Sequence, residues 1–347
     1  MPAVHESPSN VLPPSVEGAR RTMRAVVHRQ YGEPEVLTLG EVERPVPGDD
    51  DVLVRVHAAG VNIGDHHLIT GKPYLVRLSP FGGVPGPRHP VPGATMAGVV
   101  EALGAKVTGF RLGEEVYGQA AHGAFAEYVV VRAEHLAPKP RTLSFEEAAV
   151  VPWAATALQG LRDAGGVVAG QKVLIFGASG GVGTWAVQIA KALGAEVTAL
   201  CSARNVERMR ALGADEVIDY GKEDFVARGA RFDVMLDLVG SRSLADCRSV
   251  LTPEGVYVAC AGGGGDWVGP VFRIVGGLVS SWFTRRRFKT FVMAPNGKDL
   301  AFLTELVDAG KAKPVIERSY PMSEVADALR HVGEGHAQGQ TVLRIVG

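Results

Sequence analysis

Cysteine is scarce in this sequence, and neither sign of charge is in excess. Three cysteines among 347 residues, Cys201, Cys247 and Cys260, are widely spaced and form no CxxC pair. This spacing excludes a disulfide framework and a cysteine-rich zinc lobe, and it favours a reducing, cytoplasmic setting. With 36 basic and 37 acidic residues the formal net charge is −1, so the basic surface of a general nucleic-acid binder is missing. We therefore expect no nucleic-acid partner.

Long apolar runs are lacking as well. No stretch reaches the roughly 18 uncharged apolar residues that a membrane-spanning helix needs. Residues 1–22 contain Pro2, Pro8, Pro13 and Pro14 and lack the apolar core of a signal peptide. We expect a disordered tail over 1–22 and no integral membrane association. At the usual ~100 to 200 residues per domain, the rest of the chain predicts two domains.

Short apolar runs fill the first part of the chain. Between Met23 and residue 144, runs such as DVLVRVHAAGV and AEYVVVR alternate with Pro-Gly and Gly-Asp or Gly-Glu turns, a pattern typical of an all-β, barrel-like region. Ser144 and Glu147 then form a capping box, which predicts a long apolar helix over 145–165 that Pro152 interrupts. We place a domain junction here.

Strand and helix patterns alternate in the following segment. The apolar runs QKVLIFG, AEVTALC, DEVIDY, FDVMLDLVG and GVYVACAG are separated by helical patterns that end at Leu193, Leu212 and Leu251. Because crossover helices connect parallel neighbours, the alternation predicts an α/β domain with a doubly wound parallel sheet. After a helix over 297–310, PVIERSYP and QTVLRIV flank a short helix near 323–332 and can rejoin the first domain.

The strongest chemical signal is the turn in VLIFGASGGVGTWAVQIAKALGA. Gly177, Gly180 and Gly183 lie between a strand and a helix. Glycines at this spacing permit a tight turn, the close approach of a pyrophosphate and close packing of the helix on its strand. The helix N-terminus then offers N–H groups to the phosphates. The turn predicts a dinucleotide site, against the simpler alternative of a glycine turn without a ligand.

The end of the next strand indicates which dinucleotide is bound. An acidic residue there would bind the ribose 2′-hydroxyl of NAD, but the sequence reads CSARN, with Ser202 and Arg204 in its place. A guanidinium suits a 2′-phosphate by its charge and its fork geometry. We therefore predict NADPH. The alternative is that Arg204 is a solvated residue at a helix start.

These features together resemble the medium-chain dehydrogenase/reductase superfamily, in particular its zinc-free quinone oxidoreductase branch. The resemblance covers about residues 23–347 and is carried by MRAVVHRQYGEPEVL, the GASGGVG turn and GADEVIDY. HHLITGKPYLVRL is similar to members called NAD(P)-dependent alcohol dehydrogenases and reticulon-interacting oxidoreductases. The resemblance implies a GroES-like β-barrel catalytic domain over 23–144 with 314–347 and a Rossmann domain over 145–313. NADPH would lie in the cleft between them.

Zinc-dependent relatives carry a cysteine and a Gly-His-Glu that this chain lacks. Asn62 and Gly93-Ala94-Thr95 stand in their places, so we expect no metal. The adjacent His66 and His67 would point apart on a strand or turn, and His122 is expected to be an isolated surface histidine. Thr95 and Gln340 depart from the Asp and Lys often found at these places in zinc-free relatives.

The resemblance also assigns the site residues. Asn62 would approach the nicotinamide ribose or the substrate, and Thr156 the nicotinamide end. The polar candidates for orienting substrate or relaying a proton are Asp65, His67 and Tyr74. The cofactor would contact the turn residues and two strand ends, namely Gly177, Ser179, Gly180, Gly181, Val182, Gly183, Ser202, Arg204, Tyr220, Gly262 and Gly263. The alternative is that these residues have structural roles alone: Asn62 caps a turn, Tyr220 packs at the end of its strand, and Gly262 and Gly263 form a turn.

Without a Lewis acid, the favoured substrates delocalise the developing charge themselves, as quinones and α,β-unsaturated carbonyls do. We therefore expect hydride transfer from NADPH to a quinone or enone. A metal-free alcohol or carbonyl oxidoreductase and a catalytically weak NADPH-binding sensor or structural protein remain alternatives. Residues 262–293 combine glycines, aromatics and a basic cluster. They predict a cover over the cleft, a homodimer surface, a contact with anionic lipid, or a packed helix with solvated charges.

Overall fold

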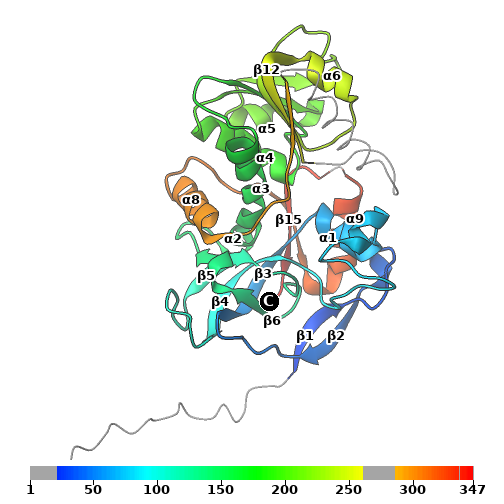
Figure 1. The fold of residues 1–347 in the computed structure, drawn as a ribbon. Coiled ribbons are helices and arrows are strands. Elements are labelled where there is room, and N and C mark those ends of the chain that lie inside the picture. The colour runs from blue at the N-terminus through cyan, green and yellow to red at the C-terminus, as the bar shows by residue number, and fades with distance from the viewer. Residues whose placement is uncertain (1–21, 261–285, 336, 347) are drawn as a thin grey trace, which may run out of the picture.

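The computed structural model describes residues 22–260, 286–335 and 337–346, and the fold has two halves, each built on its own large sheet (Figure 1). The expected tail over 1–21 lies outside the described residues. Thr22, which we assigned to that tail, instead begins β1 (Thr22–Val27), which pairs antiparallel with β2 (Thr38–Glu43). Thr22 belongs to this ladder because it pairs with Glu43, the last residue of β2.

The first half is a seven-stranded sheet with the order β14-β15-β3-β4-β5-β7, on which β6 pairs with β3. Buried valine and alanine side chains recur along its central strand, so the strand packs tightly on both sides. The strands are β3 (Asp51–Val61), β4 (Thr95–Leu103), β5 (Glu115–Gln119), β6 (Tyr128–Arg132), β7 (Leu136–Pro138), β14 (Ile316–Pro321) and β15 (Gln340–Arg344). The strand β15, near the end of the chain, thus pairs with β3, which lies in its first part.

Short helices accompany this first sheet. They are η1 (Pro34–Val36), α1 (Ile63–Thr70), η2 (Tyr74–Leu78), η3 (Ala133–His135), η7 (Met322–Glu324) and α9 (Val325–Gly333). Figure 1 shows α1 and α9 side by side, and Gly333 of α9 lies against the ring of His66. His66 and His67 therefore lie on a helix and not on the strand or turn that we expected.

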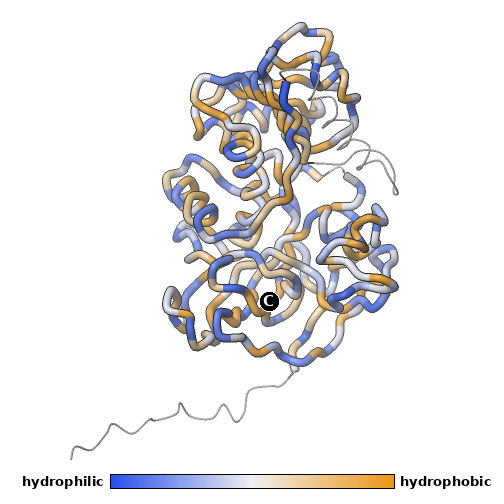
Figure 2. The backbone as a smooth tube through the Cα atoms, viewed as in Figure 1, coloured by the Kyte–Doolittle hydropathy of each residue, from blue (hydrophilic) through white to orange (hydrophobic). Residues whose placement is uncertain are grey.

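The second half is a parallel sheet with the strand order β10-β9-β8-β11-β12-β13. Its strands are β8 (Lys172–Phe176), β9 (Glu196–Cys201), β10 (Glu216–Asp219), β11 (Phe232–Asp237), β12 (Leu251–Ala259) and β13 (Arg287–Thr290). The helices are α4 (Gly181–Ala192), η6 (Ala203–Asn205), α5 (Val206–Ala211), α6 (Leu244–Ser249) and α8 (Gly297–Asp308). The order reverses around β8, as in a doubly wound fold, and the predicted fold class is confirmed. Figure 2 shows apolar strands inside each half and polar segments on the periphery.

Two predictions in this half are wrong. Leu251 was expected at the end of a helix, but it begins β12, where it pairs in parallel with Phe232 of β11 and is fully buried. One alternative for the basic cluster was a packed helix with solvated charges, but Arg287–Thr290 is strand β13 at the sheet edge, with Phe288 buried. Residues 262–285 of that segment lie outside the described residues.

A broken helical segment connects the halves. The capping box of Ser144 and Glu147 is present and starts α2 (Phe145–Val150), which packs on β3, β4 and β15. Pro152 then lies in the 3-10 turn η4 (Val151–Trp153), followed by α3 (Ala154–Leu158) and the π-helical η5 (Gln159–Ala164). The predicted interruption at Pro152 is confirmed, because a proline cannot donate the helical hydrogen bond.

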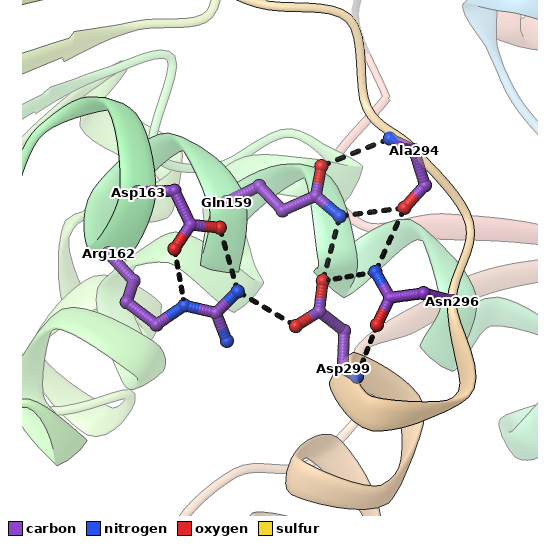
Figure 3. Close-up of polar contacts among 6 residues, drawn as sticks. All are labelled: Gln159, Arg162, Asp163, Ala294, Asn296 and Asp299. Atoms are coloured by element: carbon purple, nitrogen blue, oxygen red, sulfur yellow. Dashed lines mark hydrogen bonds and ion pairs between the residues drawn. The ribbon is translucent and has the colours of Figure 1, made fainter.

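A polar network joins this segment to the start of α8 (Figure 3). Asp299 is only 3% exposed, and its carboxylate accepts hydrogen bonds from Gln159 Nε2 at 2.7 Å and Asn296 Nδ2 at 2.9 Å. Arg162 lies 2.8 Å from its other oxygen. Burial alone would raise the pKa of Asp299, but these hydrogen bonds and the guanidinium hold that pKa below its ordinary value. The buried carboxylate of Asp299 is thereby stabilised by hydrogen bonds and by an ion pair.

Candidate functional site

The turn between β8 and α4 uses its glycines in three different ways. Gly177 has φ +85°, and a Cβ there would lie 2.6 Å from Val239 Cγ2. A Cβ on Gly183 would lie 2.1 Å from the Gly177 carbonyl oxygen, so α4 packs directly on the turn. A Cβ on Gly180 would meet only that same oxygen, at 3.6 Å. The fold requires glycine at 177 and 183, whereas at 180 the space beside the backbone is open.

The first turn of α4 offers backbone N–H groups to an anion. Gly180 is the residue before the helix, and it has no side chain to accept from these groups. Ser179 and Val182 beside it are half-buried. Partial positive charge at a helix N-terminus favours a bound phosphate. The donors therefore fit the pyrophosphate of a dinucleotide.

The ends of β9 and β10 form a second part of the site. Tyr220 follows β10, and its backbone N–H donates to the Cys201 carbonyl at 3.1 Å, so Tyr220 and Ser202 lie at neighbouring strand ends. Arg204 is exposed on η6, and the Ser202 hydroxyl accepts from Asn205 Nδ2 at 3.2 Å. The Tyr220 side chain is 56% exposed. These three side chains are thus accessible from solvent on the same edge of the sheet.

Gln340 links the glycine turn to the barrel sheet. It is buried at the start of β15, and its Nε2 donates to the Gly181 carbonyl at 2.8 Å. The next residue, Thr341, pairs with Val61 at the end of β3, and Asn62 follows Val61 directly. Gln340 thus connects the glycine turn to the strand pairing that lies next to Asn62. Sequence reasoning noted Gln340 only as a departure from the family pattern, because its partner is 159 residues away.

Buried polar atoms without a partner gather around the end of β3. They are Asn62 Nδ2, Thr95 Oγ1, Trp153 Nε1 and Thr341 Oγ1, none of which has a hydrogen-bond partner among the described residues. A Cβ on Gly60 would lie 2.6 Å from Thr95 Oγ1 and 3.1 Å from Trp153 Nε1. Buried polar groups are nearly always satisfied in a working protein. This set therefore indicates a place where a polar ligand or water completes the structure.

Asn62 directly precedes α1 as its N-terminal cap and also contributes one of these atoms. Its Oδ1 accepts from the Gly64 N–H, and the Asp65 carboxylate accepts from the Asn62 N–H at 3.0 Å. The Asn62 side-chain oxygen therefore acts as a cap, as the alternative interpretation expected, although it caps a helix. The side-chain nitrogen of Asn62 has no hydrogen-bond partner among the described residues, and the capping contact fixes its orientation.

Asp65 lines a cavity in the barrel half. Asp65 is only 4% exposed, and burial raises the pKa of its carboxyl group to about 7, although the hydrogen bond from Asn62 acts in the opposite direction. The empty space between its lining residues, with the adjoining open solvent counted in, is about 450 Å³. Its lining is apolar apart from a few groups and consists of His28, Tyr31, Asp65, Leu68, Phe81, Pro87, His89, Val91, Pro92, Gly93, Ala94, Ala121 and His122. An apolar cavity with few polar groups is the usual form of a small-molecule site.

Three histidines of this lining were missed or misread in the sequence. His89 and His122 stack with ring centroids 3.7 Å apart, so the expectation that His122 is isolated is wrong, although it is exposed. His28 is 4% exposed, and its Nδ1 has no partner in the described part of the chain. Burial lowers the pKa of all three. No sequence signal brings residues 28, 89 and 122 together, because they come from separate loops.

The other polar candidates do not line this cavity. His67 is half-buried on α1, and burial lowers its pKa. Tyr74 lies in η2 with the Arg77 guanidinium 4.8 Å from its ring centre. Thr156 is half-buried on α3. Gly262 and Gly263 lie outside the described residues.

The donor set does not fit a catalytic zinc. Within residues 22–260, 286–335 and 337–346, no three His, Cys, Asp or Glu side chains are grouped as metal ligands. Asn62 and Gly93-Ala94-Thr95 supply neither thiolate nor imidazole. All three cysteines are described, and no disulfide joins them. In the same described part of the chain, no helix is long and apolar enough to cross a membrane.

Two protein-family models match the chain. A model described as an alcohol dehydrogenase GroES-like domain matches residues 48–141, and one described as a zinc-binding dehydrogenase matches residues 212–343. A solved structure of the quinone oxidoreductase from Coxiella burnetii is 30% identical, with a TM-score of 0.81, and the match covers 94% of this chain and 100% of that one.

Several named relatives are similar over nearly the whole chain. The mitochondrial NAD(P)H oxidoreductase RTN4IP1 of Mus musculus is 36% identical, over 96% of this chain and 92% of that protein. A 2-methylene-furan-3-one reductase of Solanum lycopersicum is 34% identical, over 92% and 79% respectively. The chloroplastic NADPH-dependent alkenal/one oxidoreductase of Arabidopsis thaliana is 32% identical, over 93% and 80%.

Proposed function

The chain belongs to the medium-chain dehydrogenase/reductase superfamily, in its quinone oxidoreductase branch, and is an NAD(P)H-dependent oxidoreductase; from this membership we propose a narrower function. The protein is a zinc-independent, NADPH-dependent reductase of quinones or α,β-unsaturated carbonyls. The observation that carries this proposal is the continuity of three features. The Gly181 carbonyl of the glycine turn accepts a hydrogen bond from Gln340, and the next residue, Thr341, pairs with Val61 directly before Asn62. The Asn62 N–H donates to the carboxylate of Asp65, which lines the cavity.

The chain would bind NADPH along this path. The first turn of α4 holds the pyrophosphate at Gly180, Gly181 and Val182, and Ser202, Arg204 and Tyr220 surround the 2′-phosphate. Thr156 and the unpartnered Asn62 amide supply polar groups at the nicotinamide end. Bound NADPH supplies the hydride. Names of similar proteins support this assignment, since one is an NADPH-dependent alkenal/one oxidoreductase.

Asp65 would supply the proton. A carboxyl group whose pKa is about 7 retains a proton near neutral pH, and this one lines the cavity. Its O–H donates to the substrate oxygen as negative charge develops there, and after the hydride has added the proton passes to that oxygen. The carboxylate then regains a proton from solvent. The Asn62 N–H stabilises that carboxylate in the interval, because it donates to Oδ2. His67 and Tyr74 do not line the cavity, so we assign them no proton transfer.

The substrate class follows from the missing Lewis acid and the cavity lining. Quinones and enones spread the developing charge over conjugated atoms, so a neutral acid suffices for them, whereas a simple ketone concentrates that charge on one oxygen. The test follows NADPH absorbance with a panel of quinones, enones and simple ketones. Turnover of the first two classes supports the proposal. Turnover of ketones alone, or NADPH binding without turnover, contradicts it.

A second experiment tests the choice of NADPH over NADH. Arg204→Ala removes the guanidinium proposed to bind the 2′-phosphate, and charge-assisted hydrogen bonds contribute about 1.5–3 kcal/mol, or roughly 10- to 100-fold. We expect KM for NADPH to rise by that factor and KM for NADH to stay unchanged. Arg210→Ala is the matched control, because Arg210 is also exposed and its guanidinium pairs with Glu207 on α5. Equal effects of Arg204→Ala on both cofactors would refute the assignment.

Three broader assignments are also proposals. The catalytic domain comprises 23–144 with 314–347 and the nucleotide domain 145–313. The protein acts in the cytoplasm, although several similar proteins are named mitochondrial or chloroplastic. A homodimer is the expected assembly, and sedimentation velocity of the full chain would test it.

A further inference from the structure

One loop of the barrel half forms a wall of the cavity and also exposes apolar side chains. We call residues 71–93, which run from the end of α1 to β4, the cavity-mouth loop. Phe81, Pro87, His89 and Val91 of this loop line the cavity. The loop therefore contributes to the cavity wall and also faces solvent.

The exposed apolar side chains of the loop lie close together in sequence. Leu75 is 39% exposed, Leu78 75%, Phe81 51% and Val84 71%. Other large apolar residues that are strongly exposed, such as Val46, Leu112 and Val168, are single residues on separate loops. Scattered exposure of this kind is normal, whereas several such residues on one short segment mark an interaction surface.

The loop is compact, so these side chains share one small region. The Ser79 N–H donates to the Val76 carbonyl at 3.1 Å, and the Gly82 N–H donates to the Ser79 carbonyl at 3.2 Å. A Cβ on Gly82 would lie 2.2 Å from the Val76 carbonyl oxygen, which shows how closely the chain folds back on η2. Arg88 Nη1 then donates to the Pro80 carbonyl at 3.3 Å. The apolar residues are thus held on one structured segment.

The charges of this region are almost all positive. Between Asp65 and Glu101 the sequence has no acidic residue, whereas Lys72, Arg77 and Arg88 all lie in the loop. Arg77 stacks over the rings of Tyr31 and Tyr74. Arg29 lies nearby, since its carbonyl is 3.7 Å from the Cβ position of Gly86. The one acidic neighbour that contacts a charged loop side chain in the described residues is Glu33, 3.8 Å from Lys72.

We propose that the cavity-mouth loop docks on an anionic lipid surface, so that the substrate is a membrane-dissolved quinone or enone that enters the cavity from the bilayer. Apolar side chains insert at the level of the head groups, and basic side chains are attracted to anionic lipids. A protein partner of neutral charge would not use the basic residues. The identity of the substrate rests on the proposed function, but the docking does not.

Vesicle co-sedimentation of the full chain tests the docking. The probes are vesicles of phosphatidylcholine alone and of phosphatidylcholine mixed with phosphatidylserine. We expect binding to the anionic vesicles to be roughly tenfold stronger, and to fall with added salt. The double substitution Leu78→Ser with Val84→Ser should reduce that binding roughly tenfold, because two inserting side chains are lost. Both residues are exposed and neither lines the cavity, so the fold and the cavity are retained.

A matched double variant controls for loss of exposed apolar surface. Val46→Ser with Leu112→Ser changes two residues that are 86% and 68% exposed on other loops, and it should bind anionic vesicles like the unchanged chain. Equal binding to both vesicle types, or an equal loss in both double variants, overturns the proposal. So does a dimer that Leu78→Ser with Val84→Ser converts to monomer, because the surface would then belong to a second copy of the chain.

Activity measurements separate this proposal from the proposed function. With a water-soluble, short-chain quinone, Leu78→Ser with Val84→Ser should leave NADPH oxidation unchanged. With a long-tailed quinone embedded in anionic vesicles the same variant should lose roughly tenfold in rate. Vesicle binding by the loop without turnover of any quinone or enone would support the docking and contradict the proposed function. Turnover without vesicle binding would do the reverse.

Discussion

The glycine turn and the cavity are assembled in opposite ways. The turn takes its shape from Gly177, Gly180 and Gly183, which lie within seven consecutive residues. The cavity brings together His28, Asp65, His89 and His122, which come from four separate segments. A site built from backbone geometry can therefore be found in the sequence, whereas one built from distant side chains cannot.

The two regions also differ in what they offer a ligand. At the turn the groups are backbone N–H donors, which do not change their protonation state on burial. In the cavity the groups are titratable, and burial moves the pKa of Asp65 up and that of His28 down. Function at the turn thus depends on shape, while function in the cavity depends on a protonation state that tertiary packing sets.

Asp65→Asn should have the largest effect, because it removes the acid and keeps the shape. General acid catalysis typically contributes about 10²- to 10⁴-fold, so we expect kcat to fall at least about 100-fold while NADPH binding is unchanged. In the unchanged chain kcat should decrease as pH rises through about 7, where Asp65 loses its proton. The variant should lack this limb of the pH profile. An unchanged kcat would exclude Asp65 as the donor.

Stability gives a second readout for Asp65 that does not require substrate. Its pKa is raised from 3.8 to about 7 in the folded chain. The stabilisation it gives is therefore fully present below about pH 4 and is lost as pH rises through about 7. The unfolding free energy of the unchanged chain, relative to Asp65→Asn, should decrease over that window. A difference independent of pH would contradict a raised pKa.

Gly183→Ala should have the next largest effect and tests whether the turn depends on shape alone. Its Cβ would lie 2.1 Å from the Gly177 carbonyl oxygen, so the backbone must shift. Overpacking of this kind costs about 1–3 kcal/mol, measurable by denaturant unfolding, and nucleotide affinity should fall with it. Gly180→Ala is the control, because its Cβ meets one atom at 3.6 Å. It should keep stability and weaken only the binding of NADPH, measured by calorimetry.

Gln340→Leu tests the contact that joins the two regions. It removes the hydrogen bond to the Gly181 carbonyl, but that oxygen still accepts from Thr184 Oγ1 at 2.9 Å. We therefore expect a loss of only about 1 kcal/mol in the free energy of unfolding, with a several-fold higher KM for NADPH. Thr341→Val deletes a buried hydroxyl without a described partner, so it should leave the stability of the unliganded chain intact. Unchanged KM in Gln340→Leu would show that the link does not position the cofactor.

His122→Ala should have the smallest effect. It removes the stacking partner of His89, and aromatic pairs contribute about 0.5–1.5 kcal/mol. We expect KM for the quinone or enone to rise a few-fold with kcat nearly constant, in steady-state assays. His135→Ala, on η3 and outside the cavity lining, should change neither constant. A large fall in kcat in His122→Ala would mean that this imidazole takes part in proton transfer.

Two predictions that rest on neighbouring residues are confirmed, and two that depend on distant partners are wrong. The capping box at Ser144 and the interruption at Pro152 depend on a few adjacent residues, and both are present. Leu251 was assigned to a helix because its pairing with Phe232 of β11 is invisible in the local pattern. His122 was considered isolated for the same reason, since His89 reaches it only in the folded chain.

The sequence by itself determined the glycine turn, the parallel sheet behind it and the absence of thiolate and imidazole at the places where zinc-dependent relatives have their ligands. Each of these follows from residue type or from spacing along a single element. Only the tertiary structure decided that Gln340 meets Gly181, that Asp65 is buried in a cavity with a pKa of about 7, and that the histidines of three loops line that cavity. Burial and long-range contact change the chemistry of a side chain, and neither is encoded in its immediate neighbours.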